Sequence, residues 1–270
     1  MILASASPAI VLLSAAAVLA YAVPAALASR LNARGNRHAL LPAWVLHALV
    51  LCWGLWITAT PRFGFAPALS VTAWLVLTVY AVESHVFPQL RARWTLAGFG
   101  ALAVLLALLF PGTPLHENAS PWLPLHWALG IASYGLFAAA VLHAWLMRRS
   151  ERAMRGAGTA FPGVPLLTLE RLTFRFVQAG FVLLTATLAA GFLFGESLYG
   201  SAAAGWRWDH KTVFSVLSWA TFAVLLLGRA RFGWRGRTAV RVLYAGAVLL
   251  LLAYAGSRFV VEVLLGRGTA

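Results

Sequence analysis

Eight apolar runs separated by short polar loops limit most strongly what this chain can fold into. Most approach the roughly 20 residues that an α-helix needs to cross the hydrocarbon core of a bilayer. The runs are Ser7–Leu27, Leu40–Ala59, Ala66–Val82, Trp94–Phe110, Leu125–Met147, Phe176–Phe194, Thr212–Gly228 and Val242–Leu265. Hydrophobic residues make up 61% of the chain and charged residues 10%, whereas soluble domains carry about 25% charged residues. The sequence therefore predicts an all-α polytopic membrane protein with eight transmembrane helices, and it excludes a soluble enzyme.

The basic residues predict the orientation of these helices. Of the 21 Lys and Arg residues, 16 fall in the first, third, fifth and seventh loops between the runs. Cytoplasmic loops are enriched in Lys and Arg, so both termini are predicted to be periplasmic. The same rule accounts for the net charge of +14 without a nucleic-acid partner.

No soluble segment is long enough to fold by itself, so residues 1–270 are predicted to form a single membrane domain. Residues 1–110 contain its four N-terminal helices, and residues 111–265 contain helices five to eight. The longest loop on the arginine-rich side ends in Pro165–Phe176, whose apolar and charged residues suit a helix at the membrane surface. Cys52 is the only cysteine, which rules out an intrachain disulfide, a CxxC redox pair and a CxxCH site for covalent haem.

Two histidines begin inward-running helices on the predicted periplasmic side. His126 ends the loop before the fifth run, and His210 ends the loop before the seventh. Haem iron takes axial imidazoles, which two histidines at one depth can supply. Aromatic and basic neighbours would cover the macrocycle and meet its propionates. These neighbours are Trp122, Trp127, Trp206, Trp208, Arg207 and Lys211.

Helical spacing indicates that His126 faces protein. Gly130, Ser133 and Phe137 follow it on one helix face, and small residues mark close helix packing in membranes. A simpler reading remains open, because tryptophans at an interface are often only belt residues. His47 and His143 lie inside runs, where an ionisable residue is costly, although His143 is near enough to the arginines to snorkel. Other polar candidates are His38, His85, His116 (the rival outer ligand) and the Arg258–Glu262 pair.

Three stretches resemble the cytochrome c assembly protein family of CcsA/CcmC type, and especially its YpjD-like inner-membrane branch. They are Pro124–Gly135, Leu169–Gly180 and Trp206–Thr212, with Gly233–Arg237 and Ala253–Arg258 beyond them. In that family a tryptophan-rich periplasmic segment forms part of a haem platform, and flanking histidines hold the iron. The resemblance implies a platform of Trp206, Trp208 and Asp209, with His126 as an iron ligand.

This chain also departs from the family pattern. The first half of the tryptophan motif is absent, and no histidine lies in Ala253–Arg258, where the second flanking ligand belongs. His210 is therefore the candidate substitute, with a five-coordinate site as the alternative. These losses count against full haem-exporter or synthetase activity.

The resulting hypothesis is a multi-pass bacterial inner-membrane protein that binds haem b non-covalently and presents it at the periplasmic face. Its cofactor site would comprise His126 and His210 as metal ligands, with Trp206, Arg207, Trp208 and Asp209 around them. Its partners would be haem, the lipid bilayer, and an apocytochrome c or another biogenesis protein. We expect no catalytic residues of its own. The alternatives are an accessory or regulatory subunit that has lost haem, and a small-solute transporter.

Overall fold

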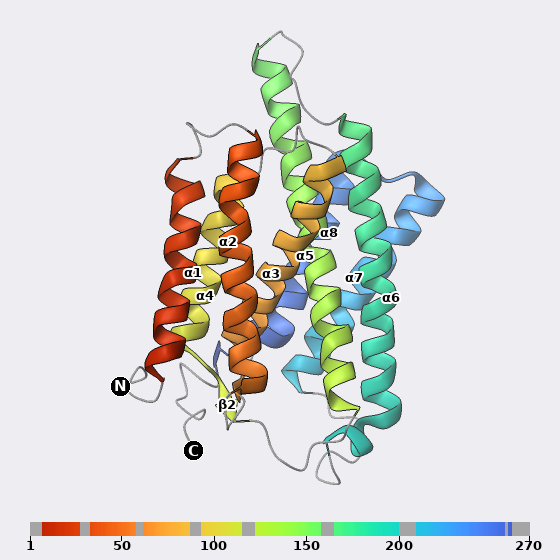
Figure 1. The fold of residues 1–270 in the computed structure, drawn as a ribbon. Coiled ribbons are helices and arrows are strands. Elements are labelled where there is room, and N and C mark those ends of the chain that lie inside the picture. The colour runs from red at the N-terminus through yellow and green to blue at the C-terminus, as the bar shows by residue number, and fades with distance from the viewer. Residues whose placement is uncertain are drawn as a thin grey trace. The chain divides into compact units, whose positions relative to one another are not determined.

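The computed structural model describes residues 7–27, 33–57, 62–86, 93–114, 122–157, 165–199, 209–256 and 259–260. Within them lie eight α-helices, as the sequence predicts, and one pair of two-residue strands, which the all-α prediction did not include (Figure 1). The helices are α1 (Pro8–Ala26), α2 (Ala33–Cys52), α3 (Phe65–Val86), α4 (Arg93–Leu109), α5 (Leu123–Ala157), α6 (Leu166–Tyr199), α7 (His210–Phe232) and α8 (Gly236–Leu251). Two π-helical turns, η2 (Trp53–Ile57) and η4 (Leu252–Gly256), extend α2 and α8.

Six of these helices are long and apolar enough to cross a membrane. The apolar parts of α2 and α4 are shorter, at His38–Cys52 and Leu96–Leu109. The chain is therefore a helical membrane protein, while the crossing by all eight helices and the side on which the termini lie stay predictions.

The chain divides into two compact units, which we describe separately. Unit 1 comprises Met1–Leu115 and Arg258–Ala270, and unit 2 comprises His116–Ser257. In unit 1, α1 packs against α2 and α4, and α3 packs against α4. In unit 2, α5 packs against α6 and α8, and α7 packs against α6 and α8.

The strands tie two loops of unit 1 together. Strand β1 (Arg62–Phe63) pairs antiparallel with β2 (Thr113–Pro114). Gly112, just before β2, has φ of +82° and lies against the Phe63 carbonyl, where a Cβ atom would collide. Glycine is required there by both the backbone conformation and the space.

A polar chain occupies the core of unit 1. His47 lies between Tyr21 and Ser70, with its Nδ1 2.9 Å from the tyrosine hydroxyl and its Nε2 2.8 Å from the serine hydroxyl. All three residues are fully buried. The tyrosine ring covers Gly100 of α4, at which a Cβ atom would lie 2.6 Å from Tyr21 Cζ. Hydrogen bonds inside a bilayer have no competing water, so the two hydrogen bonds of His47 link α1, α2 and α3.

An aromatic stack forms the centre of unit 2. The rings of Phe137 and Phe222 are parallel within 6°, with centroids 3.7 Å apart. Gly180 of α6 lies against Phe137, and Gly246 of α8 lies against Phe222. The Ser218 hydroxyl donates to the Gly246 carbonyl at 2.9 Å. Because Gly180 and Gly246 have no side chains, α6 and α8 pack closely against the Phe137 and Phe222 rings of α5 and α7.

The start of α6 differs from the expectation of a separate surface helix. From Leu166 onward the helix is uninterrupted as far as Phe194, whose non-helical backbone angles mark a kink, and helical residues follow the kink to Tyr199. Leu169, Thr173 and Val177 are buried along one face. Because that apolar face continues in register into the span, packing favours one straight helix over a bend at the membrane surface.

The turn between α7 and α8 is built from two glycines and a tryptophan. Gly233 caps α7 with φ of +63°, and Gly236 has φ of +56°. The Trp234 backbone N–H donates to the Gly228 carbonyl at 3.1 Å, and its indole covers Gly228. The helix thus ends at a glycine in the left-handed conformation, which costs other residues energy.

Reporter fusions test the predicted orientation. A fusion after Met147, at the arginine-rich end of the fifth run, should report the cytoplasm, because arginine-rich loops are retained there. A fusion after Phe194, at the far end of the sixth run, should report the periplasm. An alkaline phosphatase and green fluorescent protein pair measures both. The same location for both fusions would contradict the eight-span topology.

Candidate functional site

The first turn of α5 holds His126 against α6. The helix begins at Leu123, and the His126 backbone N–H donates to the Trp122 carbonyl at 3.1 Å. The imidazole is half-buried, with Cε1 3.5 Å from the position a Cβ atom would take on Gly191. One turn further along the helix, Gly130 lies against Thr187 in the same way. The predicted small-residue face of α5 therefore does face protein.

The start of α7 is set by Asp209. Its carboxylate accepts a hydrogen bond from the Thr212 backbone N–H at 2.8 Å and so caps the helix. Partial burial alone would raise the pKa of the Asp209 carboxyl. The hydrogen bonds from Thr212 and the charges of Lys211 and His210 outweigh burial and hold this pKa below its usual value. Asp209 is therefore a charged N-cap, which favours the helix dipole.

Lys211 is the residue of α7 that interacts electrostatically with His126. Its ammonium group lies over the ring of Tyr254 in η4, with Nζ 5.8 Å from the centroid. His210, the first residue of α7, is exposed. One end of unit 2, which we call the His126 end, thus gathers side chains from α5, α7 and η4 beside a glycine of α6.

Two tyrosines, Tyr134 of α5 and Tyr254 of η4, lie near each other further along α5 than His126. The Tyr134 hydroxyl donates to the Leu250 carbonyl at 2.5 Å, and it also lies against the backbone of Tyr254. A π-turn shifts backbone pairing by one residue, which lets a carbonyl at its start accept another donor. The η4 turn therefore positions Tyr254, and the hydrogen bond from Tyr134 to Leu250 connects α5 to α8.

Chemically, the His126 end offers the imidazole of His126, the ammonium group of Lys211 and the aromatic ring of Tyr254. A neutral imidazole ligates transition metals, and an ammonium group pairs with carboxylates or phosphates. No group of three or more His, Cys, Asp or Glu residues able to hold a bare metal ion occurs in the described part of the chain.

The structure places only part of the predicted site. His126, Asp209 and His210 are described, whereas Trp206, Arg207, Trp208 and the rival ligand His116 lie outside the described residues. The platform of tryptophans therefore stays a prediction. The predicted site does not include Tyr254, and periodicity does not reveal it, because its closeness to Tyr134 depends on the η4 turn.

The remaining histidines separate into buried and exposed groups. His47 belongs to the buried polar chain of unit 1. His143 is 1% exposed and stacks on Phe176 at 5.2 Å, so it does not snorkel toward the helix end. His38 is exposed. The side chain of His85, and both Arg258 and Glu262, lie outside the described part.

Comparison with known proteins identifies the class. The chain matches the family described as Cytochrome C assembly protein over residues 9–265. It belongs to that family. It is 31% identical over 234 residues to the inner membrane protein YpjD of Escherichia coli strain K12, covering 85% of this chain and 77% of the relative. The predicted resemblance is confirmed, and the chain is an inner-membrane protein.

Proteins named cytochrome c biogenesis protein CcsA are also similar. The relative in Synechococcus strain CC9311 is 29% identical over 245 residues, covering 77% of this chain and 79% of the relative. The relative in Gloeobacter violaceus is 34% identical over 107 residues, covering 39% of this chain and 31% of the relative. No solved structure matches the chain.

Proposed function

We propose that this protein binds haem b non-covalently at the His126 end of unit 2 and presents it to a partner in cytochrome c biogenesis. The partner would be an apocytochrome c or another biogenesis protein. The observation that carries the proposal is the half-buried imidazole of His126 beside Gly191, with Lys211 close enough for electrostatic interaction. The similarity to proteins named for cytochrome c biogenesis supports it.

The residues present fit one face of such a cofactor. His126 would supply a neutral imidazole, and the absence of a side chain on Gly191 lets this ring pack directly against α6. Lys211 supplies a positive charge for the propionates, and the Asp209 cap fixes the start of the helix that carries it. Bound haem would supply an iron centre that accepts axial nitrogen ligands. His210, one residue before Lys211, is the candidate for the opposite ligand.

We further propose that the protein handles haem without catalysing a reaction. Thioether formation joins the haem vinyl groups to cysteine thiols of the apocytochrome, so the reacting groups would belong to the cofactor and its partner rather than to this chain. The protein's contribution would be to bind haem, to orient it and to exclude lipid from one side.

Absorption spectroscopy tests the proposal. Protein purified in mild detergent and supplied with haem should show a Soret band that saturates on titration. His126→Ala should weaken haem binding at least about tenfold, because it removes an axial ligand. His38→Ala is the matched control, since His38 is exposed and lies in the other unit. Loss of the low-spin spectrum in His210→Ala as well would support paired imidazoles.

Other outcomes would favour other functions. Equal haem affinity in the parent, His126→Ala and His38→Ala would place binding elsewhere and contradict the site. No saturable haem binding by the parent would contradict the haem proposal and favour an accessory or regulatory subunit.

A further inference from the structure

We propose that the opposite end of unit 2 binds the phosphate headgroups of anionic phospholipids. The residues that would bind them are exposed arginines on three helices, which we call the arginine surface: Arg171, Arg175, Arg231, Arg237 and Arg241. This proposal does not depend on haem binding, because it concerns the other end of the helices.

An ion-pair cluster holds the three helices together at this end. The Glu170 carboxylate of α6 pairs with Arg229 of α7, and its Oε1 lies 3.6 Å from Nε of Arg235 in the turn before α8. Arg229 also stacks on Phe174 at 4.4 Å and donates to the Trp234 carbonyl at 3.2 Å. The start of α6 is therefore anchored to the turn between α7 and α8.

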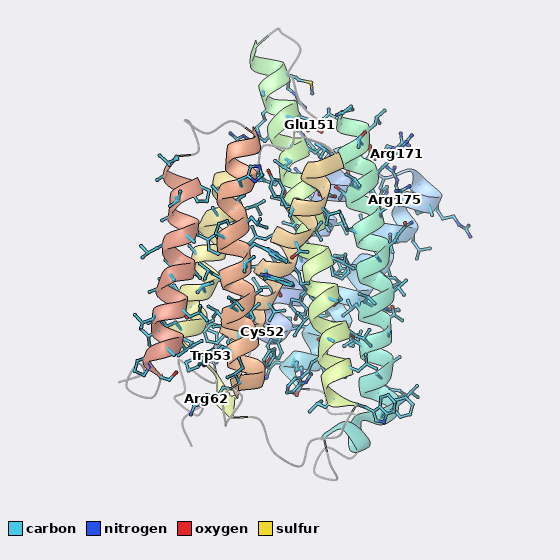
Figure 2. The ribbon with its side chains drawn as sticks, in the orientation of Figure 1. Cys52, Trp53, Arg62, Glu151, Arg171 and Arg175 are labelled. Atoms are coloured by element: carbon cyan, nitrogen blue, oxygen red, sulfur yellow. The ribbon has the colours of Figure 1, made fainter. Side chains whose placement is uncertain are left out.

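The anchoring brings two helical arginine pairs to one end of the bundle. Arg171 directly follows Glu170, and Arg175 lies one turn further along the exposed face at the start of α6 (Figure 2). Arg237 and Arg241 have the same i, i+4 spacing at the start of α8, so their side chains share one helix face. Arg231 lies in the last turn of α7.

The acidic residues described at this end are already engaged by other arginines. Glu170 pairs with Arg229 and Arg235, and Glu151 pairs with Arg148 at 3.7 Å. The five arginines of the arginine surface form no ion pair with any residue in the described part of unit 2. Five exposed positive charges at one end of the unit, with no acidic partner among the described residues, attract external anions.

A lipid headgroup fits this surface better than a soluble anion does. The arginines lie at the ends of apolar helices, and large apolar side chains beside them are exposed, namely Phe232 at 78% and Leu167 at 64%. A soluble partner would have to cover these side chains, whereas a phospholipid offers acyl chains to them and phosphate to the arginines. The guanidinium group binds phosphate through paired hydrogen bonds, and basic clusters flanking membrane helices attract anionic lipids.

Native mass spectrometry in a nonionic detergent measures the binding, with phosphatidylglycerol and phosphatidylcholine as probes. The parent should retain phosphatidylglycerol in preference to phosphatidylcholine. Arg171→Gln/Arg175→Gln and Arg237→Gln/Arg241→Gln should each lower the phosphatidylglycerol association constant roughly tenfold.

The matched control is Arg155→Gln, which is compared with the single variants Arg171→Gln and Arg237→Gln. It removes the same charge from the part of α5 that extends beyond the start of α6 (Figure 1). It should change binding less than about twofold, because attraction to a surface decays over a Debye length of about 8 Å.

Three results would overturn the proposal. They are equal retention of the two lipids by the parent, an equal loss in the control and test variants, or displacement of the lipid by millimolar inorganic phosphate. Preferential binding of a soluble polyanion such as heparin over phosphatidylglycerol would indicate a macromolecular partner instead. Unfolding midpoints in lipid-free detergent should be equal in all variants. If a double variant lowers its midpoint, the single variants Arg171→Gln and Arg237→Gln provide the same comparison.

Discussion

Gly246→Leu should prevent unit 2 from folding stably, and Gly246→Ala should lower its free energy of unfolding by about 2 kcal/mol. A Cβ atom on Gly246 would lie 2.7 Å from Phe222 Cε1. The Phe222 ring cannot retreat, because it stacks on Phe137, which in turn contacts Gly180. The cost therefore exceeds the gain of about 1 kcal/mol that alanine brings over glycine inside a helix.

Reversible denaturation in mixed micelles, followed by circular dichroism, measures this effect. Gly98→Ala and Gly130→Ala are the controls. A Cβ atom on Gly98 meets nothing within 4 Å, and one on Gly130 meets Thr187 at an ordinary 3.5 Å. Leucine in place of Phe222 should relieve the clash with the new methyl group. The loss of stability in Gly246→Ala/Phe222→Leu should therefore be less than the sum of the losses in the two single variants. Full additivity would show that the two residues do not interact as described.

His47→Leu should destabilise unit 1 by about 2 kcal/mol, because it leaves a buried hydroxyl without a partner. The imidazole bonds Tyr21 at 2.9 Å and Ser70 at 2.8 Å, and all three side chains are buried. A serine in a helix can turn to the carbonyl one turn before it. The Tyr21 hydroxyl, packed over Gly100, has no such alternative within its own helix.

The second change should restore part of the loss. His47→Leu/Tyr21→Phe removes both members of the bond and should be more stable than His47→Leu alone, since replacing both partners by apolar groups is nearly neutral. Unfolding in mixed micelles again provides the measurement, with His38→Leu as a control at an exposed position. A double variant less stable than His47→Leu would contradict the view that the orphaned hydroxyl causes the loss.

The helices were predictable because their signal is local. Long apolar runs identify the segments that leave water. The observed helices α1, α3 and α4 begin and end within a few residues of the predicted runs. The fifth and sixth runs were too short, because α5 and α6 continue into charged segments that hydropathy assigns to loops. Packing between those two helices, which no single run records, stabilises their extensions.

The candidate site was only partly predictable for the same reason. Spacing along α5 identified the protein-facing side of His126, since helical periodicity fixes which residues share a face. It did not indicate that Gly191 would lie beside the imidazole or that Tyr254 would lie under Lys211. Those contacts join helices far apart in the sequence and depend on their packing.

By itself, then, the sequence determined the membrane class, the family, the positions of the helices and the buried character of His47, because apolar length and motif residues act locally. Tertiary structure alone decided which helix each polar group meets. His47 finds Tyr21 and Ser70, and Glu170 finds Arg229 and Arg235. In a bilayer the hydrophobic effect does not choose between one apolar helix face and another. Close packing at glycines and a small number of hydrogen bonds or ion pairs make that choice.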